Sequence, residues 1–320
     1  MRITVILCTY NRCQSLANAL ASIAVSRMPE SIEWEVLVVD NNSNDGTREI
    51  VENFRGRYPR RFRYLFEPRP GKSHALNAGI AQAEGDILAF ADDDVSVEPD
   101  WLDRLTSPML EGNWAGVGGR ILPALTCPQP RWLSLKDPYA YLGSTLACFD
   151  QGDEAIQLNK SPYGANMAFR RTMFEKYGGF RTDLGPRPGS EIRNEDTEFG
   201  TRLVVASEQL LYEPAAVVHH LVSESRVRKK YFLAWWFDKG RADIREIGIK
   251  ADVRWFWRGV PLYLVRHFIV WGVRWMLAFE PRKRFDYKLK MWRRMGEIHE
   301  CFYHAVAQAP RKESGINVRG

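Results

Sequence analysis

The sequence predicts an α/β domain with a mainly parallel sheet flanked by helices, followed by a helical extension rich in basic and aromatic residues. Two observations predict it. Short apolar runs alternate with segments of helical spacing through the first hundred residues, which is typical of βαβ units. Residues 251–320 hold 14 Lys and Arg against 6 Asp and Glu, so the basic excess belongs to the tail. We expect the domain over 1–245 and the extension over 246–320.

The expected elements follow one another in a regular order. Apolar runs predict strands over 2–7, 34–39, 62–66 and 87–90, and helical spacing predicts helices over 16–23, 47–54 and 74–83. Prolines at 123, 128, 130 and 138 predict a loop-rich excursion over 111–165. Helices over 172–177 and 196–206 and an apolar strand over 215–218 are expected after it.

The composition excludes several classes of protein. Hydrophobic residues make up 45% and charged residues 26% of the 320 residues, which excludes wholesale disorder. The five cysteines form no CxxC pair, so we expect neither a cysteine zinc site nor a disulfide framework. The chain opens on an apolar strand without a signal segment, and no uncharged apolar run of about 18 residues occurs. We therefore expect a cytoplasmic protein, peripheral on the inner face of the membrane if the tail binds lipid.

Three polar clusters follow three of the expected strands: Thr9-Tyr10-Asn11, Asp40-Asn41-Asn42 and Asp92-Asp93-Asp94. In open parallel sheets, ligands bind beyond the carboxyl ends of the strands. An isolated acidic triplet is usually a solvated turn. Here it follows an apolar strand, and the carboxylates of Asp92 and Asp94 point to the same side if the chain is extended. Oxygen ligands of this kind suit Mg²⁺ or Mn²⁺ bridging a diphosphate.

Three further groups of residues are candidates for a catalytic or binding role, and each also has an ordinary structural explanation. Glu195 and Asp196 are either an exposed helix start or a general base with a neighbouring carboxylate. His219 and His220 point to opposite faces of their strand, so at most one of them joins a given site, as a metal ligand or as a structural residue. Lys72 is either a surface cation or a partner of phosphate. No P-loop, GxGxxG, HExxH or GxSxG motif occurs, which leaves phosphate handling by metal and carboxylates.

Taken together, these residues resemble family 2 glycosyltransferases of the GT-A fold. The resemblance covers roughly residues 1–245 and depends on motifs that occur in the family's order. The motifs are Thr9 to Arg12, Val38 to Thr47, Gly71-Lys72 with Leu76 to Gly79, Ala83 to Asp86 before the acidic triplet, Gly164 to Arg170, Gly178 to Phe180, Glu195-Asp196, and Tyr212 to Pro214 leading to His220. The resemblance implies a Rossmann-like GT-A domain with a nucleotide-binding half over 1–117 and an acceptor and catalytic half over 118–245.

The resemblance also implies an inverting enzyme that moves a sugar from a nucleotide diphosphate to an acceptor hydroxyl, with Mn²⁺ or Mg²⁺ as the metal. UDP is the expected nucleotide, and dTDP and GDP are the alternatives. The residues that it assigns to the nucleotide sugar are Thr9, Tyr10, Arg12, Asp40, Asn42, Lys72, Asp92, Asp93 and Gly119. Asp94, His220 and Asp92 would be the metal ligands. Asp196 is the matching base with Glu195 as its partner, and the choice between the two stays open. A sugar nucleotidyltransferase and a catalytically silent membrane-bound scaffold are the alternatives.

The tail has two interpretations. Residues 255–279 are rich in Trp, Phe, Val and Leu, but arginines interrupt them, so no stretch is long enough to span a membrane. The segment is either a helical subdomain or an interfacial helix with tryptophans at the headgroup level and arginines on anionic lipid. The basic clusters 282–284 and 293–294 favour an anionic membrane surface along 255–294, with a lipid-linked saccharide or polysaccharide precursor as acceptor. Nucleic acid is not expected as a partner, because the catalytic motifs give it no role.

Overall fold

The computed structural model describes residues 1–308 apart from 250–252, so the parts of the predicted extension over 250–252 and 309–320 lie outside the described residues. The chain divides into two compact units, Met1–Trp235 (unit 1) and Trp236–Gly320 (unit 2). Unit 1 contains all of the candidate site residues that the sequence predicts.

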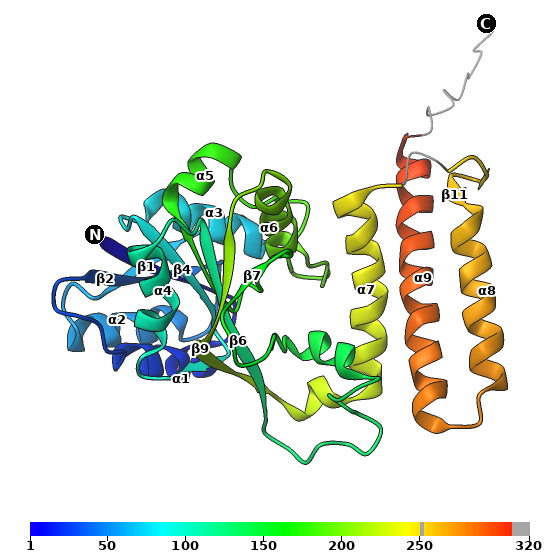
Figure 1. The fold of residues 1–320 in the computed structure, drawn as a ribbon, viewed down its shortest axis with the longest axis horizontal. Helices are drawn as coiled ribbons and strands as arrows, with labels where there is room; N and C mark the ends of the chain where they lie inside the picture. The colour runs from blue at the N-terminus through cyan, green and yellow to red at the C-terminus, as the bar shows by residue number, and fades with distance from the viewer. Residues whose placement is uncertain (250–252, 309–320) are drawn as a thin grey trace, which may run out of the picture. The chain divides into compact units, whose positions relative to one another are not determined.

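The first half of unit 1 has the strand and helix order that the sequence predicts. Its elements are β1 (Arg2–Thr9), α1 (Cys13–Ala24), β2 (Glu33–Asp40), α2 (Thr47–Arg57), β3 (Phe62–Phe66), α3 (Lys72–Gln82) and β4 (Ile87–Asp92). β1 pairs in parallel with β2 and with β4, and β2 pairs in parallel with β3. Helices α1 and α2 lie on one face of the sheet and α3 on the other (Figure 1). Along the chain, β2 and β3 are added on one side of β1, and β4 is then added on the other side. Because each crossover stays right-handed, this change of direction places α3 on the opposite face from α1 and α2.

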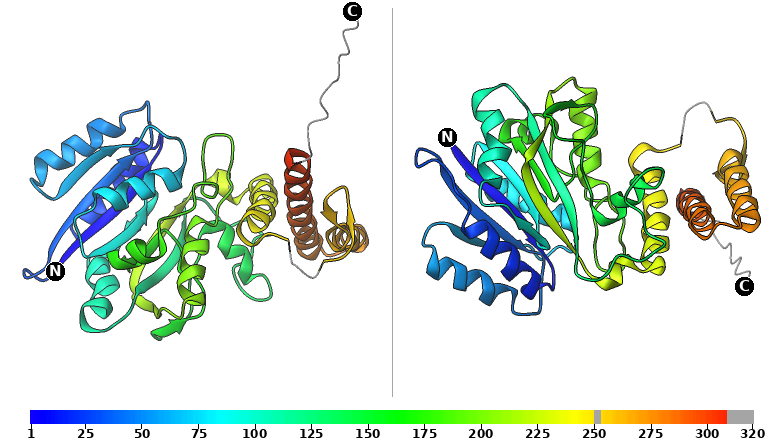
Figure 2. Two further views of the ribbon diagram at one scale, coloured as in Figure 1. Left: turned by 90° about the horizontal axis from the view of Figure 1, so that it is seen from above. Right: turned by 60° about the horizontal axis from the view of Figure 1, so that its bottom comes forward.

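The second half of unit 1 completes a nine-stranded sheet. Its elements are β5 (Val95–Val97), α4 (Trp101–Glu111), β6 (Gly116–Leu125), η1 (Ala140–Leu146), β7 (Ile156–Leu158), β8 (Asn166–Arg170), α5 (Arg171–Tyr177), α6 (Glu195–Val205), β9 (Leu210–Val222) and η2 (Glu224–Val227). The strand order is β3-β2-β1-β4-β8-β6-β9-β5, with β7 beside β9. Helix α4 lies on the face of α1 and α2, whereas α5 and α6 lie on the face of α3 (Figure 1 and Figure 2). The predicted α/β fold with helices on both faces is confirmed.

The prediction of a loop-rich excursion over 111–165 is wrong for residues 116–125, which form the inner strand β6. Gly116 lacks the apolar side chain that marks a strand, because Phe169 already fills the space: a Cβ on Gly116 would lie 2.3 Å from the Phe169 ring. Proline usually interrupts a strand, yet Pro123 lies within β6 and is paired with His220 of β9. The sequence pattern therefore does not indicate β6, because the packing of this strand requires residues that are not typical of strands.

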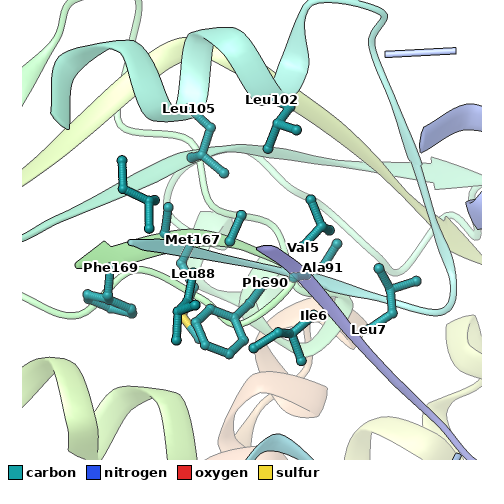
Figure 3. Close-up of a cluster of buried hydrophobic side chains, with 14 of the residues drawn as sticks. Val5, Ile6, Leu7, Leu88, Phe90, Ala91, Leu102, Leu105, Met167 and Phe169 are labelled. Atoms are coloured by element: carbon teal, nitrogen blue, oxygen red, sulfur yellow. The ribbon is translucent and has the colours of Figure 1, made fainter. Parts of the chain in front are cut away.

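The core of unit 1 lies on both sides of the sheet. Figure 3 shows Leu102 and Leu105 of α4 pointing toward the sheet, in which Met167 of β8 is buried. On the opposite face, the rings of Phe174 and Phe199 stack with their centroids 4.5 Å apart and join α5 to α6. Because both faces of β4 are covered, this buried strand is a rigid support for the acidic residues at its end.

Unit 2 consists of helices and a small hairpin. It contains the second part of α7 (Lys229–Ile247), β10 (Phe256–Trp257), β11 (Val260–Pro261), α8 (Leu262–Leu277) and α9 (Pro281–Gln308). It begins inside α7, before the predicted boundary at residue 245, because Arg241 and Arg245 of α7 both donate to the buried carboxylate of Glu300 on α9. Gly240 lets the two backbones meet, since a Cβ there would lie 2.0 Å from a carbonyl oxygen of α9. None of the described helices is both long enough and apolar enough to span a membrane.

Candidate active site

The C-terminal ends of β1, β2 and β4 meet at one edge of the sheet, because the three strands are parallel and in register. Thr9 of β1 lies opposite Asp40 of β2, and Cys8 of β1 lies opposite Asp92 of β4. The side chains of Thr9, Asp40 and Asp93 are buried. This edge therefore gathers the polar clusters that follow the three strands.

The acidic triplet turns after Asp92, so its carboxylates do not alternate as they would in an extended chain. Asp93 Oδ2 accepts a hydrogen bond from Thr9 Oγ1 at 2.7 Å, and Asp93 Oδ1 accepts one from Arg12 at 3.0 Å. The same guanidinium donates to Asp94 Oδ2 at 3.2 Å. Burial raises the pKa of Asp93 to about 6, although the charge of Arg12 opposes the shift. Asp93 and Asp94, rather than Asp92 and Asp94, thus contact the same positively charged group, which is the guanidinium of Arg12.

His220 and His219 lie on opposite faces of β9. His220 is buried, and its Nε2 lies 3.3 Å from Asp94 Oδ1. His219 faces the other way, and its Nε2 lies 2.9 Å from Glu98 Oε1. Of the two adjacent histidines, only His220 joins the acidic residues at the strand ends.

Arg226 completes this side of the site and is a residue that sequence reasoning missed. It stands on η2, directly after β9, and donates to Asp94 Oδ2 at 2.8 Å. Its other amino group lies 3.0 Å from His220 Nε2. Burial by itself raises the pKa of Asp94, but the hydrogen bond with His220 and the charge of Arg226 outweigh burial and hold the pKa below its usual range. The only available signal was an arginine in the turn that follows the histidine.

Lys72 connects the acidic triplet to the carboxylates at the start of α6. Its Nζ donates to Asp92 Oδ1 at 2.6 Å and lies 3.7 Å from Glu195 Oε1. Burial lowers the pKa of Lys72, but the charges of Asp92 and Glu195 outweigh it, so the pKa is raised and the amine stays protonated. Lys72 therefore stands between two carboxylates at the edge where phosphate was expected.

Glu195 and Asp196 differ in environment although they are adjacent. Glu195 is buried, and its Oε2 has no hydrogen-bond partner among the described residues. Burial raises the pKa of Glu195 to about 7, with Lys72 opposing the shift and Asp196 adding to it. Asp196 is partly exposed, and its carboxylate accepts backbone N–H groups from Gly164 at 2.7 Å and from Thr197 at 2.6 Å. Asp196 is thus the carboxylate of the pair that solvent reaches, and two backbone groups fix its orientation.

The loop after β2 is organised by Asp40. Its Oδ1 accepts the backbone N–H of Ser43 at 2.9 Å, and its Oδ2 accepts the hydroxyl of Tyr64 at 2.8 Å. Asn42 is exposed and adopts a φ of +68°, in the left-handed region that asparagine tolerates. Tyr10, after β1, is also exposed. The loops after β1 and β2 therefore present side chains to solvent above a buried carboxylate, and Tyr64 is a second residue that the sequence did not reveal.

Gly119 lies at an irregularity between β6 and β9, where the strand register shifts between Gly119 and Arg120. The side chain of Asn166 fills this gap: its Nδ2 donates to the carbonyls of Arg120 at 3.0 Å and Ala216 at 2.8 Å. Its Oδ1 accepts the indole N–H of Trp101 at 2.8 Å. A Cβ on Gly119 would lie 2.2 Å from Asn166 Nδ2. The structure therefore gives a packing reason for glycine at this position.

Residues 4–178, more than half of the chain, match the family model Glycosyl transferase family 2. The chain belongs to this family. The succinoglycan biosynthesis protein ExoM of Rhizobium meliloti is 31% identical over 252 residues, which are 78% of this chain and 77% of that protein. The glucosyl-dolichyl phosphate glucuronosyltransferase of Haloferax volcanii is 26% identical over 74% of this chain and 75% of its own length.

The fold of this family 2 glycosyltransferase also resembles a solved structure. A mannosyltransferase from Pyrobaculum calidifontis, in complex with GDP-Man and Mn²⁺, has a TM-score of 0.55 over 96% of this chain and 75% of its own, with 21% identity. The likeness supports the GT-A fold that the sequence predicts. The protein is therefore a glycosyltransferase with a nucleotide-sugar donor, on a fold whose strand ends carry the residues described above.

The donor atoms of Asp94 and His220 fit a divalent cation in this glycosyltransferase. A carboxylate oxygen and an imidazole nitrogen are both ligands of Mn²⁺. Their separation of 3.3 Å is close to the value of about 3 Å for adjacent ligands about 2.1 Å from one octahedral ion. Among the described residues, no group of three or more His, Cys, Asp and Glu side chains is arranged to hold a metal ion. The protein would thus supply two ligands and leave positions for a diphosphate and water.

A separate hollow of about 650 Å³ lies beside α3 and α5. Its lining includes Asn77, Arg171, Phe174, Gly179 and Phe180. None of the acidic triplet, Glu195 or Asp196 lines it. The hollow is therefore distinct from the cluster at the strand ends of the glycosyltransferase.

Proposed function

We propose that the enzyme is an inverting glycosyltransferase that binds a nucleotide diphosphate sugar beyond the ends of β1, β2 and β4. The observation that carries the proposal is the grouping of Asp94 with His220 and of Asp92 with Lys72 at the same edge as Asp196. Such an edge combines candidate metal ligands with a carboxylate that solvent reaches. The ends of β1 and β2 and the loops after them, with Thr9, Tyr10, Asp40 and Asn42, would then hold the nucleoside.

The donor diphosphate is proposed to bind with Mn²⁺ or Mg²⁺. Asp94 and His220 would hold the ion, which when bound neutralises charge on the departing diphosphate. The mannosyltransferase neighbour carries GDP-Man and Mn²⁺, which supports a divalent ion at this type of site. UDP is the nucleotide that the resemblance implies and GDP is the one that the neighbour binds, so both belong in the first binding experiment. Lys72 and Arg12 would face the phosphate side, and Gly119 supports the strand beside it.

Asp196 is proposed as the general base. Its carboxylate takes the proton of the acceptor hydroxyl while that oxygen forms a bond to the anomeric carbon. The bond from that carbon to the diphosphate oxygen breaks, and its electron pair leaves with the nucleotide. One displacement inverts the anomeric configuration and needs no enzyme nucleophile. The N–H groups of Gly164 and Thr197 hold the base in place, and Glu195, buried beside Lys72, would be its partner.

The acceptor is proposed to be a lipid-linked or polysaccharide-precursor saccharide at the inner face of the membrane. Two relatives support this: ExoM is named for succinoglycan biosynthesis, and the Haloferax volcanii enzyme is named for a glucosyl-dolichyl phosphate. The basic extension supports a position near anionic lipid.

Thermal shift with nucleotides tests the donor side. Wild-type protein should be stabilised by UDP or GDP and its sugar more strongly with Mn²⁺ than without, by mass action. Asp94→Ala should lose the part that depends on Mn²⁺. An equal shift in the variant would contradict the metal assignment, and pyrophosphate release from a nucleoside triphosphate and a sugar phosphate would favour a sugar nucleotidyltransferase.

Transfer kinetics test the base. Asp196→Asn should lower kcat by about 10²–10⁴-fold while nucleotide binding is retained. Glu195→Gln is the matched comparison, because it removes the neighbouring charge from the same helix end. If Asp196→Asn keeps the wild-type kcat and Glu195→Gln loses it, Asp196 is not the base. The anomeric configuration of the product, measured by NMR, tests inversion separately.

A further inference from the structure

We propose that the outer face of α8 docks on an anionic phospholipid bilayer, with the helix lying along the headgroup region without crossing it. The outer face consists of the exposed side chains of Leu262, Ile269, Val270, Val273, Met276 and Leu277. The proposal deepens the proposed function, and it rests on that function for the lipid-linked acceptor. It names the surface that would bring the enzyme to such an acceptor.

Helix α8 is apolar on two opposite faces. Within unit 2 it is the outermost helix, and α9 lies between it and α7 (Figure 1). Its inner face meets α9, where Leu264 is buried and the ring of Trp271 lies 5.7 Å from that of Tyr287. Gly272 also lies on this face, where a Cβ would stand 3.3 Å from the sulfur of Met291 on α9.

None of the described residues covers the outer face. At about 100° per residue, its six side chains fall within an arc of about 120° on the side away from α9. Ile269 is 57% exposed and Met276 is 64% exposed. A contiguous exposed apolar patch on a helix commonly marks a surface that contacts a further apolar partner or a membrane. The described residues cover only the inner face of α8, so the outer face is available for such a contact.

Exposed aromatic side chains flank α8 along the chain at both of its ends. Trp255 and Trp257, on the hairpin before α8, are 74% and 60% exposed, and Phe279, just after α8, is 100% exposed. Between them the outer face is mostly aliphatic. Indole rings favour the boundary between headgroups and acyl chains, and aliphatic groups favour the acyl side. This distribution matches a helix that lies flat in the boundary.

The charge around the outer face selects an anionic surface. Over 253–285 the exposed charged side chains are Arg254, Arg258, Arg266, Arg274, Arg282, Lys283 and Arg284 against Glu280 alone. Arg266 and Arg274 stand within or beside the outer face, where their stems can follow the acyl boundary while their guanidinium groups reach lipid phosphates. A second copy of this chain would bring like charges together. Nucleic acid would pair with the charges but would leave the aliphatic arc uncovered.

Sedimentation of the full chain with vesicles tests the proposal. We expect binding to vesicles of phosphatidylcholine with phosphatidylglycerol, weakened by salt, and little binding to phosphatidylcholine alone. The double variant Ile269→Glu, Val273→Glu should bind at least about tenfold more weakly, because it places charge in the apolar arc. The double variant Arg266→Gln, Lys283→Gln should lose about tenfold on the anionic vesicles only.

Val25→Glu is the matched control, since Val25 is 60% exposed at the end of α1 in unit 1. It should bind vesicles like the wild type. Circular dichroism and thermal midpoints establish that each variant is folded. Equal vesicle binding by the Ile269→Glu, Val273→Glu variant, or a dimer that this variant abolishes while no vesicle binding is seen, would overturn the proposal.

Nucleotide-dependent thermal shift, measured on the same preparations, keeps the two proposals apart. Intact donor binding without vesicle binding would overturn the docking surface and leave the proposed function standing. Vesicle binding without any nucleotide-dependent shift would support the docking surface and contradict the proposed function.

Discussion

The buried carboxylate of Glu195 should make the wild-type protein less stable at neutral pH than the Glu195→Gln variant, in which an uncharged side chain of the same shape replaces it. Glu195 has 4% exposure, one contact of 3.7 Å with Lys72, and an Oε2 without a hydrogen-bond partner among the described residues. Burial raises its pKa from 4.5 to about 7, with Lys72 and Arg193 opposing and Asp196 assisting the shift. Glu195→Gln keeps the shape and removes the charge, so it isolates this cost.

The sign follows from proton linkage. A folded-state pKa above the unfolded value means that the folded state binds the proton more tightly, so the group's contribution to stability is lost as the pH rises through about 7. The raised pKa of Glu195 lowers the free energy of unfolding by about 3 kcal/mol at pH 8 and by about 1 kcal/mol at pH 5, relative to a side chain that stays uncharged. Glu195→Gln should therefore exceed the wild type in free energy of unfolding by up to about 3 kcal/mol at pH 8, and by about 2 kcal/mol less at pH 5.

Urea unfolding at both pH values, followed by tryptophan fluorescence, measures this difference. Glu111→Gln removes an exposed carboxylate from α4 and should change the free energy of unfolding by no more than about 0.5 kcal/mol. A Glu195→Gln advantage that does not grow between pH 5 and pH 8 would refute the reasoning. A Glu195→Gln variant that is less stable than the wild type at pH 8 would refute it too. The attraction between Glu195 and Lys72 would then stabilise the protein by more than the burial of the carboxylate destabilises it.

Three further variants test the packing and the ionic contacts. Gly119→Ala should lower the free energy of unfolding by about 3 kcal/mol, because its Cβ would meet Asn166 Nδ2 at 2.2 Å and the Ala216 carbonyl oxygen at 2.3 Å; an unchanged urea midpoint would contradict this, since both Asn166 and the β9 backbone would then have to move without cost. Trp101→Phe should cost about 1–3 kcal/mol in the same assay by leaving the buried Asn166 Oδ1 unpaired, and a loss below that range would contradict it. Arg226→Met should strengthen Mn²⁺ binding without nucleotide, measured by electron paramagnetic resonance, because the guanidinium occupies both proposed ligands. Arg228→Met, which changes an arginine paired with Glu224, is its control, and equal affinities in the two variants would contradict the competition.

Much of the nucleotide-binding half could be predicted from sequence because its strands are buried on both faces. Such strands appear as continuous apolar runs, and a polar cluster begins where each run ends. Parallel pairing alone then brings Thr9, Asp40 and Asp92 to one edge. No knowledge of side-chain contacts is needed for that step, which is why the location of the candidate site follows from pattern.

The second half was harder because its packing removes the pattern. Gly116 and Gly119 lack side chains where Phe169 and Asn166 approach, so β6 has no apolar periodicity over these positions. The contacts of Arg226 depend on the reach of a long side chain from a turn, for which no periodicity exists. The turn after Asp92 likewise depends on local contacts with the loops after other strands.

The choice between the two histidines shows how strand register connects these parts. β5 begins directly after Asp94 and pairs antiparallel with β9, so that Val95 stands opposite His220. Because side chains alternate along a strand, His219 must then face the other side, and a slip of one residue would exchange the two. The register of β9 against β6 shifts beside Gly119, at the gap that Asn166 fills. Among the hydrogen bonds of the described residues, Asn166 makes none to Asp94 or His220, yet it joins β6 to β9 at the shift that precedes both histidines.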